Sequence, residues 1–180
     1  MTGTAERTAA DRPTRFDRRM YEVMNRREAA ALHATAGRRR AFVAAHIVLT
    51  AAAVAAWLGT VLGDQLWWLF VMLGTIPPWV FVMGVLNGAT RGLLELRTRI
   101  LDERQIAERA AVLARAHKLT TWLFFGATAG AGAAAWFGDM NGEVMLFSVL
   151  FVVLVVHWLM PAWVAGLRVQ DEVEDDLGME

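Results

Sequence analysis

Four long apolar runs organise this chain, and they cover approximately residues 41–62, 66–87, 119–137 and 144–167. Each run holds about 19–24 residues, enough to cross a hydrocarbon layer of about 30 Å as a helix that rises about 1.5 Å per residue. The pattern therefore predicts an all-α integral membrane protein. We expect a bundle of four transmembrane helices, arranged as two hairpins over residues 41–87 and 119–167.

The basic residues predict how these helices cross the membrane. All eighteen Lys and Arg residues lie outside the apolar runs and outside the short gaps within the two hairpins. They gather in segments 1–40 and 88–118, with one more at Arg168. Because basic loops stay on the cytoplasmic side, both termini and the middle segment are predicted to be cytoplasmic. The acidic tail, 168–180, does not alter this orientation, since acidic residues contribute little to it.

The overall composition agrees with a membrane protein. Apolar residues make up 56% of the chain, above the usual share in soluble domains. Cysteine is absent, which excludes disulfides and thiolate chemistry. We expect no secretory signal peptide, because the first apolar run is too long and too far from the start. The strong preference for Arg over Lys is typical of a GC-rich bacterium, so the predicted location is the bacterial inner membrane.

The amino-terminal segments are predicted to differ from each other. Residues 1–13 are small and polar, and we expect them to be disordered. Segment 14–40 is predicted to be an Arg-rich amphipathic helix, with Gly37 as its stop and a helical stripe of Phe16, Met20, Val23 and Met24. Two interpretations fit this helix. Either its arginines only set topology, or it lies on the surface of anionic lipid.

The segment 88–118 is predicted to form two cytoplasmic helices that meet near Asp102. Leu93, Leu96 and Ile100 continue a helical stripe beyond the second apolar run, and Asp102 with Gln105 resembles a capping box. These helices are either a solvated charged surface or a docking site for a partner. The candidate docking residues are Asp102, Glu103, Arg104 and Arg109.

Prolines and glycines mark two of the predicted spans. Pro77 and Pro78 fall midway along the second run, where the loss of two backbone donors predicts a kink. Two interpretations of this kink remain: it allows the helix to pack in the bundle, or it lines a path for a solute. In the third run, Gly126 and Gly130 form a GxxxG pattern, which predicts a helix-packing face within the bundle or between two copies.

His46 and His157 are the only ionisable residues inside the predicted spans. We expect each to be hydrogen bonded within the packing; ligation of haem or a metal is the alternative. Their depths differ by about 7–8 Å at about 1.5 Å rise per residue, a poor match for two axial haem ligands. The sequence therefore predicts no cofactor and no metal site.

The predicted spans lack Lys, Arg, Asp and Glu, which argues against coupled transporters and proton pumps. No nucleophile–base pair or paired carboxylates indicate an enzyme. We expect no nucleic-acid partner, although the net charge of zero does not itself bear on this point. A gapped internal similarity pairs Ala45-His46 with Ala116-His117 and Pro78-Trp79-Val80 with Pro161-Ala162-Trp163-Val164. Either chance or a two-plus-two parallel hairpin repeat explains it.

Two short stretches resemble known bacterial membrane families. Residues 40–87 resemble the bacterial two-transmembrane hairpin domain through Arg40-Ala41-Phe42, His46, Trp67-Trp68, Gly74 and Trp79. The Trp-Gly core of that family's second helix is not reproduced. Leu101-Asp102-Glu103-Arg104, with Arg109-Ala110, is similar to a DER-type motif of small multi-span bacterial membrane proteins. Neither resemblance implies a defined biochemical activity.

These features favour a small, non-enzymatic accessory or scaffold protein of the inner membrane. Its expected partners are the lipid bilayer, including anionic lipid, a membrane or cytoplasmic protein held by the cytoplasmic helices, and further copies of itself. A small oligomeric transporter or channel, with the break at Pro77-Pro78 lining its path, is the alternative. A haem-binding membrane protein is the third interpretation.

Overall fold

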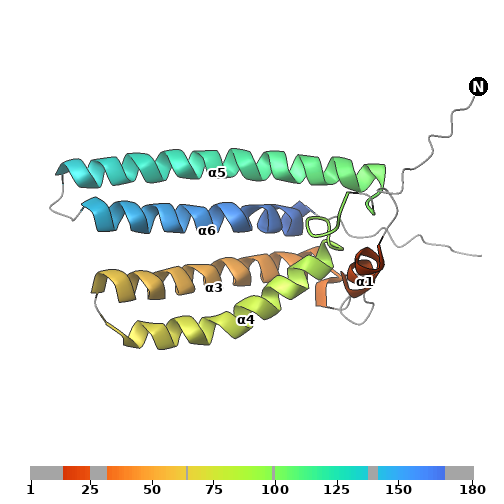
Figure 1. The fold of residues 1–180 in the computed structure, drawn as a ribbon, viewed down its shortest axis with the longest axis horizontal. Helices are drawn as coiled ribbons and strands as arrows, with labels where there is room; N and C mark the ends of the chain where they lie inside the picture. The colour runs from red at the N-terminus through yellow and green to blue at the C-terminus, as the bar shows by residue number, and fades with distance from the viewer. Residues whose placement is uncertain (1–13, 25–31, 64, 99, 138–141, 169–180) are drawn as a thin grey trace, which may run out of the picture.

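The computed structural model is helical and describes residues 14–24, 32–63, 65–98, 100–137 and 142–168. The predictions for residues 1–13 and for the acidic tail concern residues outside these ranges, except that Arg168 of the tail is described. The main helices are α1 (Arg15–Met24), α3 (Ala36–Gly63), α4 (Trp67–Ala89), α5 (Glu103–Phe137) and α6 (Gly142–Arg168). Helices α3 and α4 form one hairpin, α5 and α6 form another, and both turn at the same end of the molecule (Figure 1).

Three of the described helices are long and apolar enough to cross a membrane. They are Ala36–Val61, Trp67–Ala89 and Met145–Arg168, with mean hydropathies of 2.1, 2.0 and 2.3. An all-α protein with several membrane-spanning helices is thus supported. Helix α5 is not among the three, because Gly, Ala and Thr replace larger apolar residues in much of its apolar half.

Helix α6 joins the two hairpins. It lies beside α5 on one side and packs against α3, and more lightly α4, on the other. The core where α3, α4 and α6 meet consists of Val43, Val82, Leu86, Leu159 and Trp163. Gly166 permits the close approach there, since a Cβ at this position would lie 2.8 Å from Cγ2 of Val43. A second core cluster ties α5 to α6 and to the connection after α4, and contains Leu93, Val112, Ala116, Val164 and Ala165.

The connection from α4 to α5 differs from the expected pair of helices. Helix α4 ends at Ala89, and residues 90–101 form successive turns. The end has Schellman geometry: Arg91 N–H donates to Gly88 O and Gly92 N–H donates to Asn87 O, both over 2.9 Å. Arg91 and Gly92 have φ values of 52° and 70°, in the left-handed region that stops a helix. The predicted helix before Asp102 is therefore wrong.

Three of the leucines of that connection are nevertheless buried, whereas Leu94 and Ile100 are only partly buried. Leu93, Leu96 and Leu101 are at most 7% exposed, because the turns fold them back against the helices. The spacing of the predicted stripe, Leu93, Leu96 and Ile100, is compatible with a helix and with these turns alike, so it does not distinguish the two.

The starts of α3 and α5 are fixed by side-chain caps. Thr35 Oγ1 accepts from Arg38 N–H over 3.3 Å, so Gly37 lies in the first turn of α3 and does not end a helix as predicted. At α5, Asp102 and Gln105 exchange reciprocal bonds of 3.1 and 2.7 Å between side chain and backbone. The predicted capping box is confirmed. Helix α5 then continues unbroken from its polar first half into its apolar half.

Candidate functional site

Most of the charged residues that the structure describes lie at one end of the molecule, opposite the two hairpin turns. We call this region the polar end: it consists of α1, residues 32–40, the connection 90–101 and the first turns of α5. Long-range polar contacts assemble it, so it is a built surface rather than a set of separate charged loops.

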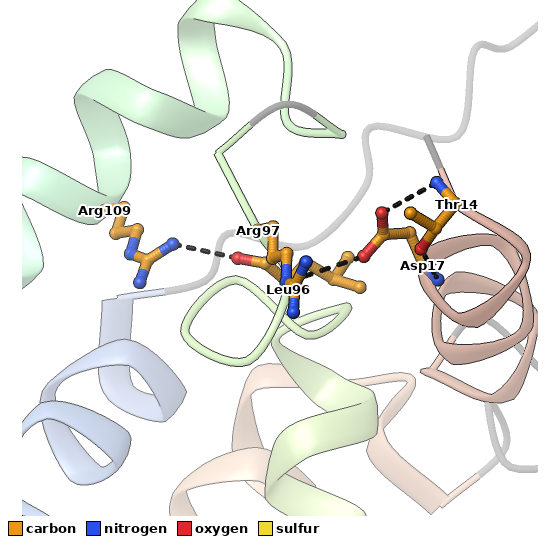
Figure 2. Close-up of polar contacts among 5 residues, drawn as sticks. All are labelled: Thr14, Asp17, Leu96, Arg97 and Arg109. Atoms are coloured by element: carbon orange, nitrogen blue, oxygen red, sulfur yellow. Dashed lines mark hydrogen bonds and ion pairs between the residues drawn. The ribbon is translucent and has the colours of Figure 1, made fainter. Parts of the chain in front are cut away.

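A buried carboxylate holds α1 in place. Asp17 is 2% exposed, and its Oδ2 accepts from Thr14 N–H over 2.8 Å, while Thr14 Oγ1 accepts from Asp17 N–H over 3.2 Å. Arg97 of the connection places its Nε 3.8 Å from Asp17 Oδ1 (Figure 2). Asp17 therefore caps α1 and pairs with a cation some eighty residues further along the chain.

An apolar contact supports the same docking. A Cβ at Gly92 would lie 3.0 Å from Cγ of Met24, so the α1 side chain rests on the glycine backbone of the connection. Phe16 and Val23, which belong to the predicted stripe of α1, are instead 63% and 45% exposed. Of the predicted stripe, Met24 therefore packs on the protein, whereas Phe16 and Val23 do not.

Arg109, a predicted docking residue, is engaged within the fold. Its Nη1 donates to the carbonyl oxygen of Leu96 over 2.9 Å, across the gap between α5 and the connection (Figure 2). This carbonyl lies in a turn region and gains a charged donor. The contact positions the connection against α5 and gives Arg109 a structural role.

A cleft of about 330 Å³ lies between α1 and the start of α5. We call it the polar cleft, and it is lined by Arg18, Tyr21, Glu22, Ile100, Asp102 and Gln105. It offers a guanidinium, carboxylates, a phenol and an amide in one place, a set that suits a polar or charged peptide segment. Of the predicted docking residues, Asp102 lines this cleft, while Glu103 and Arg104 are exposed outside it.

Sequence reasoning missed the contribution of α1 to this cleft. Arg18, Tyr21 and Glu22 lie about eighty residues from Asp102 in the chain, and no spacing or motif connects them. The burial of Asp17 indicates that this charged helix docks on the protein, but burial is not visible in a sequence.

The structure separates His46 and His157, the two histidines of the predicted spans. His46 of α3 is fully buried, and its Nδ1 accepts from Trp163 Nε1–H of α6 over 2.9 Å. The Trp79 indole of α4 lies 4.7 Å from the His46 ring and donates to Thr50 Oγ1 over 2.9 Å. These four residues form a polar cluster that connects three helices.

His157, in contrast, is exposed on α6, where it lines a groove against α5 together with His117. His46 and His157 therefore do not share a site. Among the residues described, no group of three or more His, Asp or Glu side chains is placed to hold a metal ion.

The predicted kink and packing residues lie on outward faces. Pro77 and Pro78 are inside α4, which bends along its length in Figure 1, and both are exposed. Among the described residues of one chain, both prolines lie at the surface rather than in the core. Gly126 and Gly130 are also exposed, and a Cβ at either would meet nothing within 4 Å. Within one copy they pack no neighbouring helix, which leaves a contact between copies as the prediction.

Comparisons with protein-family models, with curated proteins and with solved structures find no match to this chain. The two short resemblances stated above therefore stay predictions. The class that the structure itself defines is a helical protein with several apolar, membrane-compatible helices and an assembled polar end.

Proposed function

We propose that this chain is a small, non-enzymatic scaffold protein of a bacterial inner membrane, and that its polar cleft binds a charged segment of a partner protein. The observation that carries the proposal is the docking of α1 through Asp17 and Arg97, which builds the cleft from distant parts of the chain. A helix that served only to set topology would need no buried carboxylate of this kind.

The proposal includes four membrane spans with both termini in the cytoplasm. Helix α5 lies beside α6 along the whole apolar length of α6, and both hairpins turn at the same end (Figure 1). If α6 crosses the bilayer, the apolar half of α5 occupies the same depth. The polar end then carries the basic segments and faces the cytoplasm.

The large apolar side chains that are exposed on the helices agree with this membrane arrangement. Phe70, Phe125, Leu154 and Trp158 are 76%, 68%, 63% and 72% exposed in the single chain. A bilayer covers such side chains without any protein partner. The bilayer does not cover the polar cleft in this arrangement, because the charged lining of the cleft lies at the end of the molecule opposite the hairpin turns.

Site-specific photo-crosslinking in the host membrane tests this function. A photoreactive residue at Arg18 or Glu22, which line the cleft, is expected to trap one defined protein partner. The same probe at Arg104, exposed on the neighbouring turn of α5, serves as the matched control. Asp17 and Asp102 are left intact because they cap helices.

A charge reversal completes the experiment. Arg18→Glu should abolish the cross-link from Glu22, and the variant should keep the parent's unfolding temperature, since Arg18 is exposed. Equal cross-linking from the cleft and from Arg104, or no protein cross-link at either cleft position, would overturn the scaffold function.

A further inference from the structure

Helix α6 ends at Arg168, close to the start of α3 and the end of α4. A Cβ at Gly166 would lie 2.8 Å from a methyl carbon of Val43 and 3.3 Å from one of Leu86. Arg40 lies three residues before Val43, about one helical turn nearer the polar end, and its side chain is exposed. An arginine of α3 therefore lies near the point where the chain leaves α6.

The other neighbours of this helix end are also basic. Ala165 belongs to the same core cluster as Leu93 of the connection and Ala116 of α5. Arg91 lies two residues before Leu93, and Arg115 directly precedes Ala116. Both arginine side chains are exposed. Each of the three parts of the chain beside the end of α6 thus contributes an arginine.

We call Arg40, Arg91 and Arg115 the basic rim, and they belong to an end of the molecule with an excess of positive charge. The described residues 14–24, 32–40, 90–98 and 100–118 contain twelve Lys or Arg and six Asp or Glu. One of these acids, Asp17, is buried and paired with Arg97. The segment 169–180, which follows α6, contains six Asp or Glu and no Lys or Arg. This segment and the surface beside its start are therefore oppositely charged.

The segment is also long enough to reach the basic rim. Twelve extended residues span up to about 40 Å, whereas Arg40 lies only about 5 Å along α3 from Val43, which contacts α6. Exposed ion pairs contribute little one at a time. A tethered segment, however, meets its partner at an effective concentration of the order of millimolar, so several weak pairs suffice.

We infer that residues 169–180 fold back on the basic rim and cover it. The contact is autoinhibitory, because an anionic partner of this surface must first displace the segment. The rim lies outside the polar cleft. The inference therefore requires neither the scaffold function nor a membrane crossing of α5.

Cross-linking between two introduced cysteines tests this contact, since the chain has no cysteine of its own. Gly37→Cys lies about one turn before Arg40, where a Cβ meets nothing within 4 Å, and Gly178→Cys marks the acidic segment. The full-length protein in an uncharged detergent is treated with a short bismaleimide at low salt. We expect a cross-link within one chain, and salt of about 0.5 M should lower its yield.

The matched variant neutralises five carboxylates of the segment and keeps its length. It combines Asp171→Asn, Glu172→Gln, Glu174→Gln, Asp175→Asn and Asp176→Asn. We expect this variant to lower the yield of the cross-link by about fivefold, as the loss of several weak ion pairs implies. Equal yields for the charged and the neutralised segment would overturn the inference.

Two pairs of arginine variants assign the effect to the basic rim. Arg40→Gln/Arg115→Gln should lower the yield by about threefold or more. Arg18→Gln/Arg104→Gln removes the same charge from exposed positions elsewhere at the polar end and should leave the yield unchanged. Equal effects of the two pairs would overturn the inference. Cross-links that join two chains would do the same, since the segment would then cover a second copy.

Discussion

The indole nitrogen of Trp163 lies 2.9 Å from Nδ1 of His46, and this hydrogen bond joins residues 117 positions apart on α6 and α3. Because the indole can only donate, Nδ1 accepts, and a neutral His46 ring carries its proton on Nε2. Both side chains are buried, so the bond forms away from water. Because a hydrogen bond is directional and apolar contacts are not, this bond specifies the relative position of the two hairpins in a way that the surrounding apolar contacts do not.

Removal of this donor should destabilise the protein. Trp163→Phe keeps an aromatic ring but leaves Nδ1 of His46 buried and unsatisfied, at an expected cost of about 1–3 kcal/mol. Thermal unfolding in detergent measures the loss. Trp158→Phe, the same change on an exposed part of α6, is the control and should unfold like the parent. Equal unfolding temperatures for both variants would show that the bond contributes nothing to stability.

Glycine substitutions should separate close packing from open faces. Gly166→Ala places a methyl group 2.8 Å from Val43 and 3.3 Å from Leu86, and should cost about 1–3 kcal/mol through overpacking. Gly74→Ala meets nothing within 4 Å and should leave stability equal or higher, because alanine favours helix. Chemical or thermal unfolding of the two variants in the same detergent gives the comparison. A Gly166→Ala protein as stable as Gly74→Ala would refute the packing argument.

The docking of α1 should depend on Asp17. Asp17→Ala removes the cap of α1 and the partner of Arg97, with an expected loss of about 1–2 kcal/mol that is confined to this helix. Hydrogen–deuterium exchange should therefore rise over residues 14–24 and stay unchanged in α3 and α6. Glu22→Ala alters the exposed side of the same helix and should exchange like the parent. An increase spread evenly over all helices would indicate a global effect instead.

The sequence predicts those features that depend on local pattern. The apolar runs predict α3, α4 and α6 as membrane-compatible helices, and the capping box at Asp102 predicts the start of α5. The sequence predicts less clearly that α5 spans the membrane, because a helix rich in small residues has a lower mean hydropathy than one rich in leucine.

Features that depend on long-range contacts could not be predicted. The pairing of Asp17 with Arg97 joins two segments with no common motif. The stripe of Leu93 and Leu96 fits a helix as well as turns, and only Gly92 argues for the turn. The sequence predicts Arg109 as a docking residue because its charge is visible there, whereas its bond to the carbonyl oxygen of Leu96 is not.

Acid should weaken the packing of residues near the start of α3. Burial, and next the positive charge of Arg39, lower the pKa of His33 below its ordinary 6.5, and its ring lies near Gly88 of α4. The folded state therefore binds this proton less readily than the unfolded state, so its stability falls as the pH drops below about 6.5. Unfolding temperatures between about pH 5 and 8 measure the trend.

His33→Gln is the matched test of that trend, since glutamine retains polar groups but does not titrate in this range. The variant should show a smaller loss of stability on acidification than the parent. Identical pH profiles for the two proteins would assign the acid sensitivity to other groups.

Cysteine labelling should decide whether α5 crosses the membrane. The chain contains no cysteine, so single cysteines at Gln65, Arg104 and Phe137 report on their own positions. All three residues are exposed, and Phe137 ends α5. With the protein in a bacterial inner membrane, a membrane-impermeant maleimide added to spheroplasts should label Gln65→Cys and Phe137→Cys. Arg104→Cys should react only after permeabilisation, because the polar end faces the cytoplasm. If Phe137→Cys instead behaves like Arg104→Cys, α5 does not cross, and the protein has three spans rather than four.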